Sequence, residues 1–136
     1  MKKLIVGMML LFGLSAVAQQ SGPPSGLEIP SNMKQYIVAF LVEAPGTHND
    51  PQMKKNHLAF IRQQIEAGKM VLAGPFTDQG KIAGMFILNV ATADDAKSLL
   101  AQEPMTKAGW VTVEAHPAML PDLSAVKVVY GPKTAQ

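Results

Sequence analysis

The sequence predicts an α+β domain of the ferredoxin-like class, with the element order β-α-β-β-α-β. Three observations support this class. Four short apolar runs have the length of strands. Two longer segments place apolar residues at helical spacing, one after the first strand and one after the third. A chain of 136 residues without cysteine also suits a single domain held together by its core alone.

Residues 1–18 predict a secretory signal peptide. Lys2 and Lys3 precede an apolar stretch, and the small residues of Ala16-Val17-Ala18 predict cleavage after Ala18. The alternative, an uncleaved membrane anchor, is less favoured because the stretch is shorter than the roughly 20 residues of a spanning helix. The absence of cysteine excludes a lipid-anchored lipoprotein. We therefore expect a secreted or periplasmic protein that has no membrane segment once the signal is removed.

The charge balance does not indicate a nucleic-acid partner. The chain has 12 basic and 10 acidic residues, but Lys2 and Lys3 belong to the signal peptide, so the mature domain is close to neutral. The sequence also contains no phosphate-binding loop, dinucleotide fingerprint or nucleophile elbow. We expect neither nucleic acid nor a cofactor to bind.

The first predicted elements are a flexible lead, a strand and a long helix. Residues 19–33 are rich in proline, glycine and serine, which is typical of a flexible segment. Residues 35–43 are apolar, β-branched and aromatic, as in a strand buried on both faces. After a polar loop, Asp50-Pro51 predicts an N-cap and a first helical residue. Gly68 should end this helix.

Within this helix, the apolar spacing predicts which side is buried. Leu58, Ile61 and Ile65 should form the stripe that packs against the sheet. His57 lies beside that stripe, in line with Met53 and Gln64, at the edge of the core where a cleft could open. Four charged residues should mostly face away from the sheet: Lys54, Lys55, Arg62 and Glu66.

The next elements are two strands joined by a hairpin, followed by a second helix. Residues 70–75 and 82–91 predict the strands, and residues 77–81 predict the hairpin. Thr92 should cap the helix, with Asp94 and Asp95 in the first turn, where the helix dipole favours acidic side chains. The pair Glu103-Pro104 should break the helix.

The last predicted strand alternates over residues 110–116, with Trp110, Thr112 and Glu114 on one face. The domain then covers residues 34–117, and residues 118–136 form an extension. Within the extension, the apolar run from Ala125 to Tyr130 could pair with a sheet edge or clasp a partner. Two helices on one side of the sheet leave the other side exposed, so we expect a homodimer through that face.

Five motifs follow one another along the predicted domain. They are His57-Leu58-Ala59-Phe60, the run from Glu66 to Pro75, the hairpin Asp78-Gln79-Gly80, the strand segment from Gly84 to Leu88, and the segment from Glu103 to Gly109. In this order and spacing they resemble the YciI-like (YCII-related) family. The resemblance covers residues 36–117, essentially the whole predicted fold.

The resemblance implies a dimeric α/β-barrel built from two ferredoxin-like halves, with a fold similar to that of muconolactone isomerases. Most members have no assigned activity, and one is described as a dehydrochlorinase of a chlorinated hydroxyquinol. A histidine that matches His57 is the suspected active-site residue, and its acidic partner usually belongs to an Asp-Pro pair. This chain has Glu103-Pro104 instead. Typical members are cytoplasmic and lack the signal peptide, the lead and the C-terminal extension.

The residues themselves allow a proton-transfer site. An imidazole titrates near neutrality and can take or give a proton once a carboxylate fixes its tautomer. His57 with Glu103 or Asp78 would form such a catalytic pair. Each residue also has a structural interpretation. His57 could be a boundary residue bonded to a carbonyl, Asp78 a hairpin residue, and Glu103 a cap.

The other histidines and the glycine-proline pair carry weaker indications. His48 lies in a polar loop and His116 ends a strand, and no His-x-His, His-Glu-x-x-His or cysteine pair predicts a metal site. Gly74-Pro75 ends a strand where the backbone must turn, which could let a ligand approach the main chain.

Two functions from different classes fit these observations. The first is a cofactor-independent lyase or isomerase that acts on a small cyclic or aromatic compound, with His57 moving the proton. The second is a non-catalytic module for small-molecule binding or dimerisation. The exchange of Asp for Glu before the proline and the relocation outside the cytoplasm both favour the second.

Overall fold

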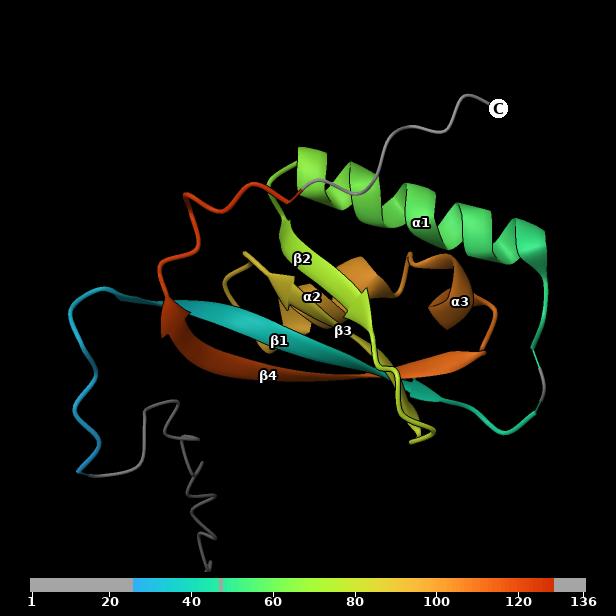
Figure 1. Ribbon diagram of the computed structural model, residues 1–136, viewed down its shortest axis with the longest axis horizontal. Helices are drawn as coiled ribbons and strands as arrows, with labels where there is room; N and C mark the ends of the chain where they lie inside the picture. Colours follow the sequence, from blue (N-terminus) through green and yellow to red (C-terminus); the bar gives the residue numbers. More distant parts are fainter. Residues whose placement is uncertain (1–25, 47, 129–136) are drawn as a thin grey trace, which may run out of the picture.

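The computed structural model describes residues 26–46 and 48–128. Its elements are β1 (Met33–Glu43), α1 (Pro51–Glu66), β2 (Met70–Pro75), β3 (Ile82–Leu88), α2 (Ala93–Leu100), α3 (Pro104–Lys107) and β4 (Val111–Pro121). The four strands form one antiparallel sheet in the order β2-β3-β1-β4 (Figure 1). The predicted α+β fold is confirmed, with the short helix α3 added. The predicted signal peptide and residues 19–25 of the lead lie outside the described residues.

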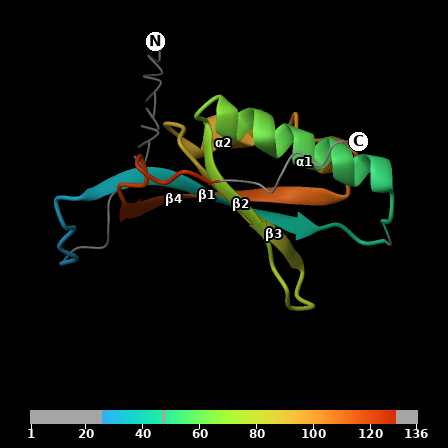
Figure 2. The same ribbon diagram turned by 45° about the horizontal axis from the view of Figure 1, so that its top comes forward.

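Both long helices cover the same face of the sheet (Figure 2). On the central strand β1, Ile37, Ala39 and Leu41 point toward the helices and are at most 4% exposed. They pack in one core cluster with Phe60 of α1 and Leu100 of α2. The alternation of a strand therefore places the neighbouring side chains of β1 on the uncovered face. None of the described helices is both long and apolar enough to cross a membrane.

The helix α1 begins and ends where the sequence predicts. The side chain of Asp50 accepts a hydrogen bond from the Gln52 amide, and Pro51 is the first helical residue. Gly68 follows the helix with a φ of 69°, a left-handed conformation that glycine adopts without strain.

The buried side of α1 matches the predicted stripe at Ile61 and Ile65 but not at Leu58. Leu58 is 43% exposed, whereas Phe60, Ile61 and Gln64 are buried. The helix is turned so that the row through His57, Phe60 and Gln64 faces the sheet, and this row brings a histidine to the edge of the core. The prediction for Leu58 was wrong because it followed aliphatic spacing and gave no weight to the aromatic and amide side chains.

N-cap residues mark the starts of the helices α2 and α3. Thr92 caps α2 as predicted, in a reciprocal capping box with Asp95. The segment after Glu103, predicted to be a plain connection, forms the single turn of α3, whose N-cap is Glu103. The strand β3 ends at Leu88, earlier than the predicted residue 91.

The strand β4 continues beyond its predicted end at residue 116. It pairs with β1 along its whole length, from Val111 opposite Glu43 to Pro121 opposite Met33. Since β4 is an edge strand, Pro117 and Pro121 do not remove hydrogen bonds that a central strand would need. Val111 is buried and Thr112 and Glu114 are exposed, so the predicted alternation holds in the first half of the strand. Trp110, which was predicted to share a face with Thr112 and Glu114, precedes the strand.

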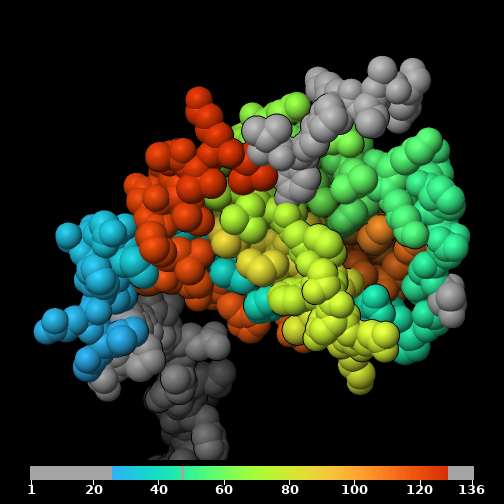
Figure 3. All heavy atoms as spheres, viewed as in Figure 1, coloured from blue at the N-terminus to red at the C-terminus, as the bar shows by residue number. Residues whose placement is uncertain are grey.

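After β4 the chain starts next to the end of the N-terminal lead, drawn in blue in Figure 3, and then runs toward α1 and β2 (Figure 1). The Asp122 amide donates to the Asn32 carbonyl at 2.9 Å, and the Leu123 amide donates to the hydroxyl of buried Tyr36 at 2.8 Å. Residues 125–128 form no strand, so the predicted edge strand is not found in the described part of that run. Residues 129 and 130 of the run lie outside the described residues.

Candidate functional site

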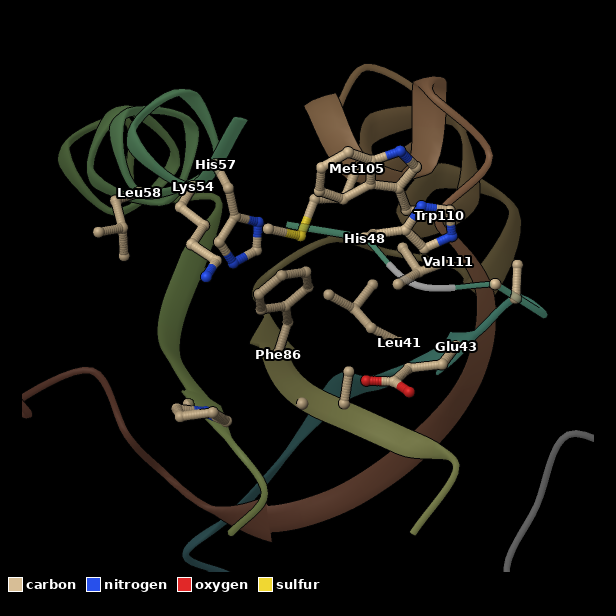
Figure 4. A pocket seen from close by; sticks show the side chains of 16 residues that line it. Leu41, Glu43, His48, Lys54, His57, Leu58, Phe86, Met105, Trp110 and Val111 are labelled. Atoms are coloured by element: carbon tan, nitrogen blue, oxygen red, sulfur yellow. The ribbon is translucent and has the colours of Figure 1, made fainter. Parts of the chain in front are cut away.

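A cavity of about 460 Å³ opens between α1, α3 and the sheet. Its walls are mainly apolar and come from distant parts of the chain: Leu41, Phe86, Met105, Trp110 and Val111. Figure 4 shows Phe86 and Leu41 below the cavity and Met105 above it. The volume falls within the range of about 300–1,000 Å³ that is usual for small-molecule sites. The cavity can therefore hold a compound of one or two rings.

His57 reaches this cavity from the N-terminal half of α1. Its side chain is 17% exposed, and its ring lies 6.2 Å from the ring of Phe86, centroid to centroid. In Figure 4 the imidazole projects from the helix into the cavity. Its atom Nδ1 lies 2.8 Å from Oε1 of Glu103. The predicted pairing of His57 with Glu103 is therefore present in the structure.

Glu103 is fixed by the helix that it caps. Its side chain is completely buried and accepts hydrogen bonds from the amides of Met105 and Thr106 and from the Thr106 hydroxyl, at 2.8–3.0 Å. The two interpretations of Glu103, as a cap and as the partner of His57, therefore both apply. The cap sets the carboxylate in place, and the carboxylate sets the imidazole in place.

The pKa of Glu103 reflects two opposing effects. Burial would raise the pKa, because a carboxylate loses its hydration in the interior. The hydrogen bonds from His57, Met105 and Thr106, together with the charge of the imidazole, outweigh burial and hold the pKa below its ordinary value of 4.5. Glu103 is therefore ionised at neutral pH and accepts hydrogen bonds only.

This contact decides which nitrogen of His57 is available. When the imidazole is neutral, Nδ1 must carry the proton that it donates to ionised Glu103. Nε2 is then the unprotonated nitrogen, and the described residues provide no hydrogen-bond partner for it. A ligand in the cavity would meet a nitrogen that can accept a proton and return it.

A stacked pair of rings forms one side of the cavity. The ring of His48 lies on the indole of Trp110, with 4.7 Å between centroids and 15° between planes. Both residues line the cavity, together with the charged side chains of Lys54 and Glu43. In Figure 4, Lys54 lies beside His57, and Glu43 lies on the opposite side.

The predicted backbone approach at Gly74-Pro75 is also part of the cavity wall. A Cβ atom on Gly84, in the paired strand β3, would lie 2.8 Å from the carbonyl oxygen of Gly74. This is too close for any other residue without movement of the backbone, so glycine at residue 84 keeps the two strands together at the cavity.

The structure separates Asp78 from the pair that it was predicted to join. Asp78 is exposed in the hairpin between β2 and β3 and does not line the cavity. His116 is exposed on β4, where its ring lies 6.2 Å from that of Phe40. Residues 26–46 and 48–128 contain no group of three His, Cys, Asp or Glu side chains arranged to hold a metal ion.

Sequence reasoning missed several cavity residues. Lys54 was predicted to face away from the sheet, yet it lies one helical turn before His57 and lines the cavity. Glu43 ends β1, and His48 lies in the loop that follows. Only the position of Lys54 relative to His57 could have been found in advance, because residues three apart are neighbours on a helix surface.

The model of one family, described as the YCII-related domain, matches residues 35–129. No curated protein matches the chain. Among solved structures, the chain is similar to 5-chloro-2-hydroxyhydroquinone dehydrochlorinase from Burkholderia phenoliruptrix AC1100, in complex with 2,5-dihydroxybenzoquinone. The identity is 19%, the TM-score is 0.43, and the alignment covers 60% of this chain and 90% of the other.

Proposed function

This chain belongs to the family of YCII-related domains, and from that premise we propose that it is a secreted lyase or isomerase. In this proposal it acts on a small cyclic or aromatic compound, and His57 transfers a proton during an elimination or isomerisation. Glu103 acts through His57 as a positioning residue. No cofactor takes part.

One observation carries the proposal. A largely buried imidazole lies in a mainly apolar cavity, and its Nδ1 is held at 2.8 Å by a fully buried, ionised carboxylate. A histidine that only fills the boundary of a core does not need a charged, desolvated partner that is itself held by three further donors. The arrangement fixes the tautomer and leaves Nε2 toward the ligand space.

The roles of the residues follow from their positions. Nε2 of His57 would take a proton from a carbon or an oxygen of the bound compound, and Glu103 would stabilise the imidazolium that forms. The proton would then return to another atom of the compound or leave with a departing group. The apolar side chains of Phe86, Leu41 and Met105 would hold a ring and exclude water.

A deuterium-exchange experiment tests the proposal without a known substrate. A panel of cyclic ketones and hydroxylated aromatic compounds is incubated in D₂O, and exchange of carbon-bound hydrogen is followed by ¹H NMR. We expect the wild type to accelerate exchange in at least one compound. General acid–base catalysis is worth about 10²–10⁴-fold, so His57→Gln should lose about that factor.

Two carboxylate variants complete the experiment. Glu103→Gln should lower the exchange rate by about 100-fold, since the imidazole loses its ionised partner. Asp78→Asn should leave the rate unchanged, because Asp78 lies outside the cavity. A compound that binds in the cavity without any exchange in the wild type would instead support the second function, a non-catalytic binding module.

A further inference from the structure

The cavity has an ammonium group on one side and a carboxylate on the other, around an apolar centre. Lys54 and His57 lie on one side, and Glu43 lies on the other (Figure 4). Aromatic and aliphatic side chains separate the two sides, chiefly Phe86 and Leu41. This distribution of charge constrains which ligands the cavity can bind.

The charge of Lys54 is not neutralised within the described structure. Its Nζ donates a hydrogen bond to the neutral side chain of Asn49, at 3.1 Å. Within residues 26–46 and 48–128 the only ion pair is that of His57 with Glu103. An ammonium group thus faces the cavity next to the imidazole and can attract an anionic group of a ligand.

Glu43 provides the opposite charge at the far side. Its backbone is fixed, because its amide donates to the Lys81 carbonyl at 2.8 Å. No cationic side chain of the described residues lies within ion-pair distance of its carboxylate. A second negative charge on a ligand would meet repulsion there, whereas a neutral or hydrogen-bond-donating end would not.

We propose that the cavity selects a planar monoanion, a ring that bears one carboxylate or phenolate group. The anionic group lies beside Lys54, the ring packs against Phe86 and Leu41, and the uncharged end points toward Glu43. The proposal rests on the proposed function only in using the same cavity. It assigns Lys54 as the residue that selects substrates by charge.

Binding of three simple probes tests this proposal. Benzoate is the monoanion, benzamide is its neutral counterpart of the same shape, and terephthalate carries a second carboxylate at the far end. Affinities are measured by ¹H–¹⁵N NMR titration of the wild type at low ionic strength, using the signals of Gly84 and the Trp110 indole. We expect benzoate to bind about five- to tenfold more tightly than benzamide, since the ammonium is partly exposed to solvent. Terephthalate should bind more weakly than benzoate.

Variants of neighbouring lysines provide the control. Lys54→Met should make benzoate and benzamide bind equally well, by weakening benzoate alone. Lys55→Met removes the same charge from the next residue of α1, which does not line the cavity, and should keep the preference. Glu43→Gln should make the affinity for terephthalate more similar to the affinity for benzoate. Lys54→Gln serves as a second variant if the methionine disturbs α1.

Three results would overturn the proposal. They are equal binding of benzoate and benzamide to the wild type, an equal loss of preference in the Lys54 and Lys55 variants, and the absence of benzoate-induced shifts at the cavity at millimolar concentration. Deuterium exchange by the wild type separates this proposal from the catalytic one. If the preference for benzoate persists while the wild type shows no deuterium exchange, the charge selection stands and the proton transfer fails.

Discussion

Glu103 illustrates how a buried charge is kept in a small domain. A carboxylate without contact to solvent would be unfavourable by several kcal/mol if it lacked partners. Here two backbone amides, a hydroxyl and an imidazole surround it, and the pKa of the carboxyl group falls below 4.5 in spite of burial. The favourable interactions therefore exceed the loss of hydration, and the ionised form is part of the folded state.

Replacement of this carboxylate should weaken the fold as well as the site. Glu103→Gln keeps the shape but turns an NH₂ group toward one of the donors, so we expect a loss of about 2 kcal/mol in the free energy of unfolding at neutral pH. Urea denaturation followed by circular dichroism measures this loss. The matched control is Glu66→Gln, at the exposed end of α1, which should change stability by less than about 0.5 kcal/mol.

The same carboxylate predicts how stability depends on pH. Because the pKa of Glu103 is lower in the folded state than its ordinary value of 4.5, the unfolded chain takes up the proton first as the pH falls. The stabilisation is fully present above pH 4.5 and is lost as the pH falls through the folded pKa. Urea denaturation in steps from neutral pH to acid should show a steeper loss for the wild type than for Glu103→Gln. Parallel curves would contradict the account.

At the residue scale, the sequence identified the central pair but not its surroundings. His57 and Glu103 could be predicted because a family motif marks both. Asp78 was a reasonable alternative partner, since the sequence does not show how far the hairpin that carries it lies from His57. Lys54 was assigned to the solvent side because charged residues are mostly exposed. Its ammonium is exposed, yet it borders a cavity that exists only after folding.

At the scale of the elements, the contact between β2 and β3 is set by two glycines of different importance. A Cβ on Gly84 would lie 2.8 Å from the carbonyl oxygen of Gly74, whereas a Cβ on Gly74 would meet no atom within 4 Å. Gly84→Ala should therefore lower the free energy of unfolding by about 1–3 kcal/mol, as overpacking does. Gly74→Ala is the control and should change it little. Urea denaturation of both variants measures their free energies of unfolding. Equal values would contradict this description of the strand contact.

The C-terminal extension is joined to the sheet by the hydroxyl of Tyr36. This group accepts from the Leu123 amide at 2.8 Å and donates to the Asp122 carboxylate at 3.3 Å. Tyr36→Phe removes only the hydroxyl and should lower the free energy of unfolding by about 1 kcal/mol. Hydrogen exchange of the Leu123 amide should accelerate at the same time. Unchanged exchange at Leu123 would show that other contacts hold the extension.

Local signals predicted the helix ends better than the buried faces of the helices and the ends of the strands. Asp50, Thr92 and Gly68 mark helix ends through short-range hydrogen bonds and backbone conformation, which the sequence encodes directly. The exposure of Leu58 and the extension of β4 through Pro117 depend on which neighbours the elements meet. These tertiary contacts cannot be predicted from the spacing of apolar residues alone.

At the scale of the whole molecule, the uncovered face of the sheet is the main feature without a partner in the described chain. Phe40 and Val38 of β1 lie on this face, opposite the side that carries the helices, and Met85 and Ile87 pair with them on β3. The ring of Phe76 lies 6.4 Å from that of Phe40. We propose that two copies associate through this face, since Val38, Phe40 and Met85 present partly exposed apolar side chains there.

Light scattering after size-exclusion chromatography tests this association. The wild type should have twice the mass of one chain. Phe40→Lys places a charge at the centre of the face and should give a monomer that keeps the same circular dichroism spectrum. Glu66→Lys, on the opposite side of the molecule, should remain a dimer. A monomeric wild type would contradict the proposed association and leave the cavity unaffected.

The most direct test of the central claim is the tautomer of His57. In ¹H–¹⁵N NMR spectra recorded at alkaline pH, where an imidazole is neutral, the two ring nitrogens have distinct chemical shifts. The account predicts that Nδ1 carries the proton, because it donates to Glu103, and that Nε2 is unprotonated and shifts when a ligand enters the cavity. A proton on Nε2 would contradict the assignment of His57 as the base. Ring signals that do not shift with any cavity ligand would contradict it as well.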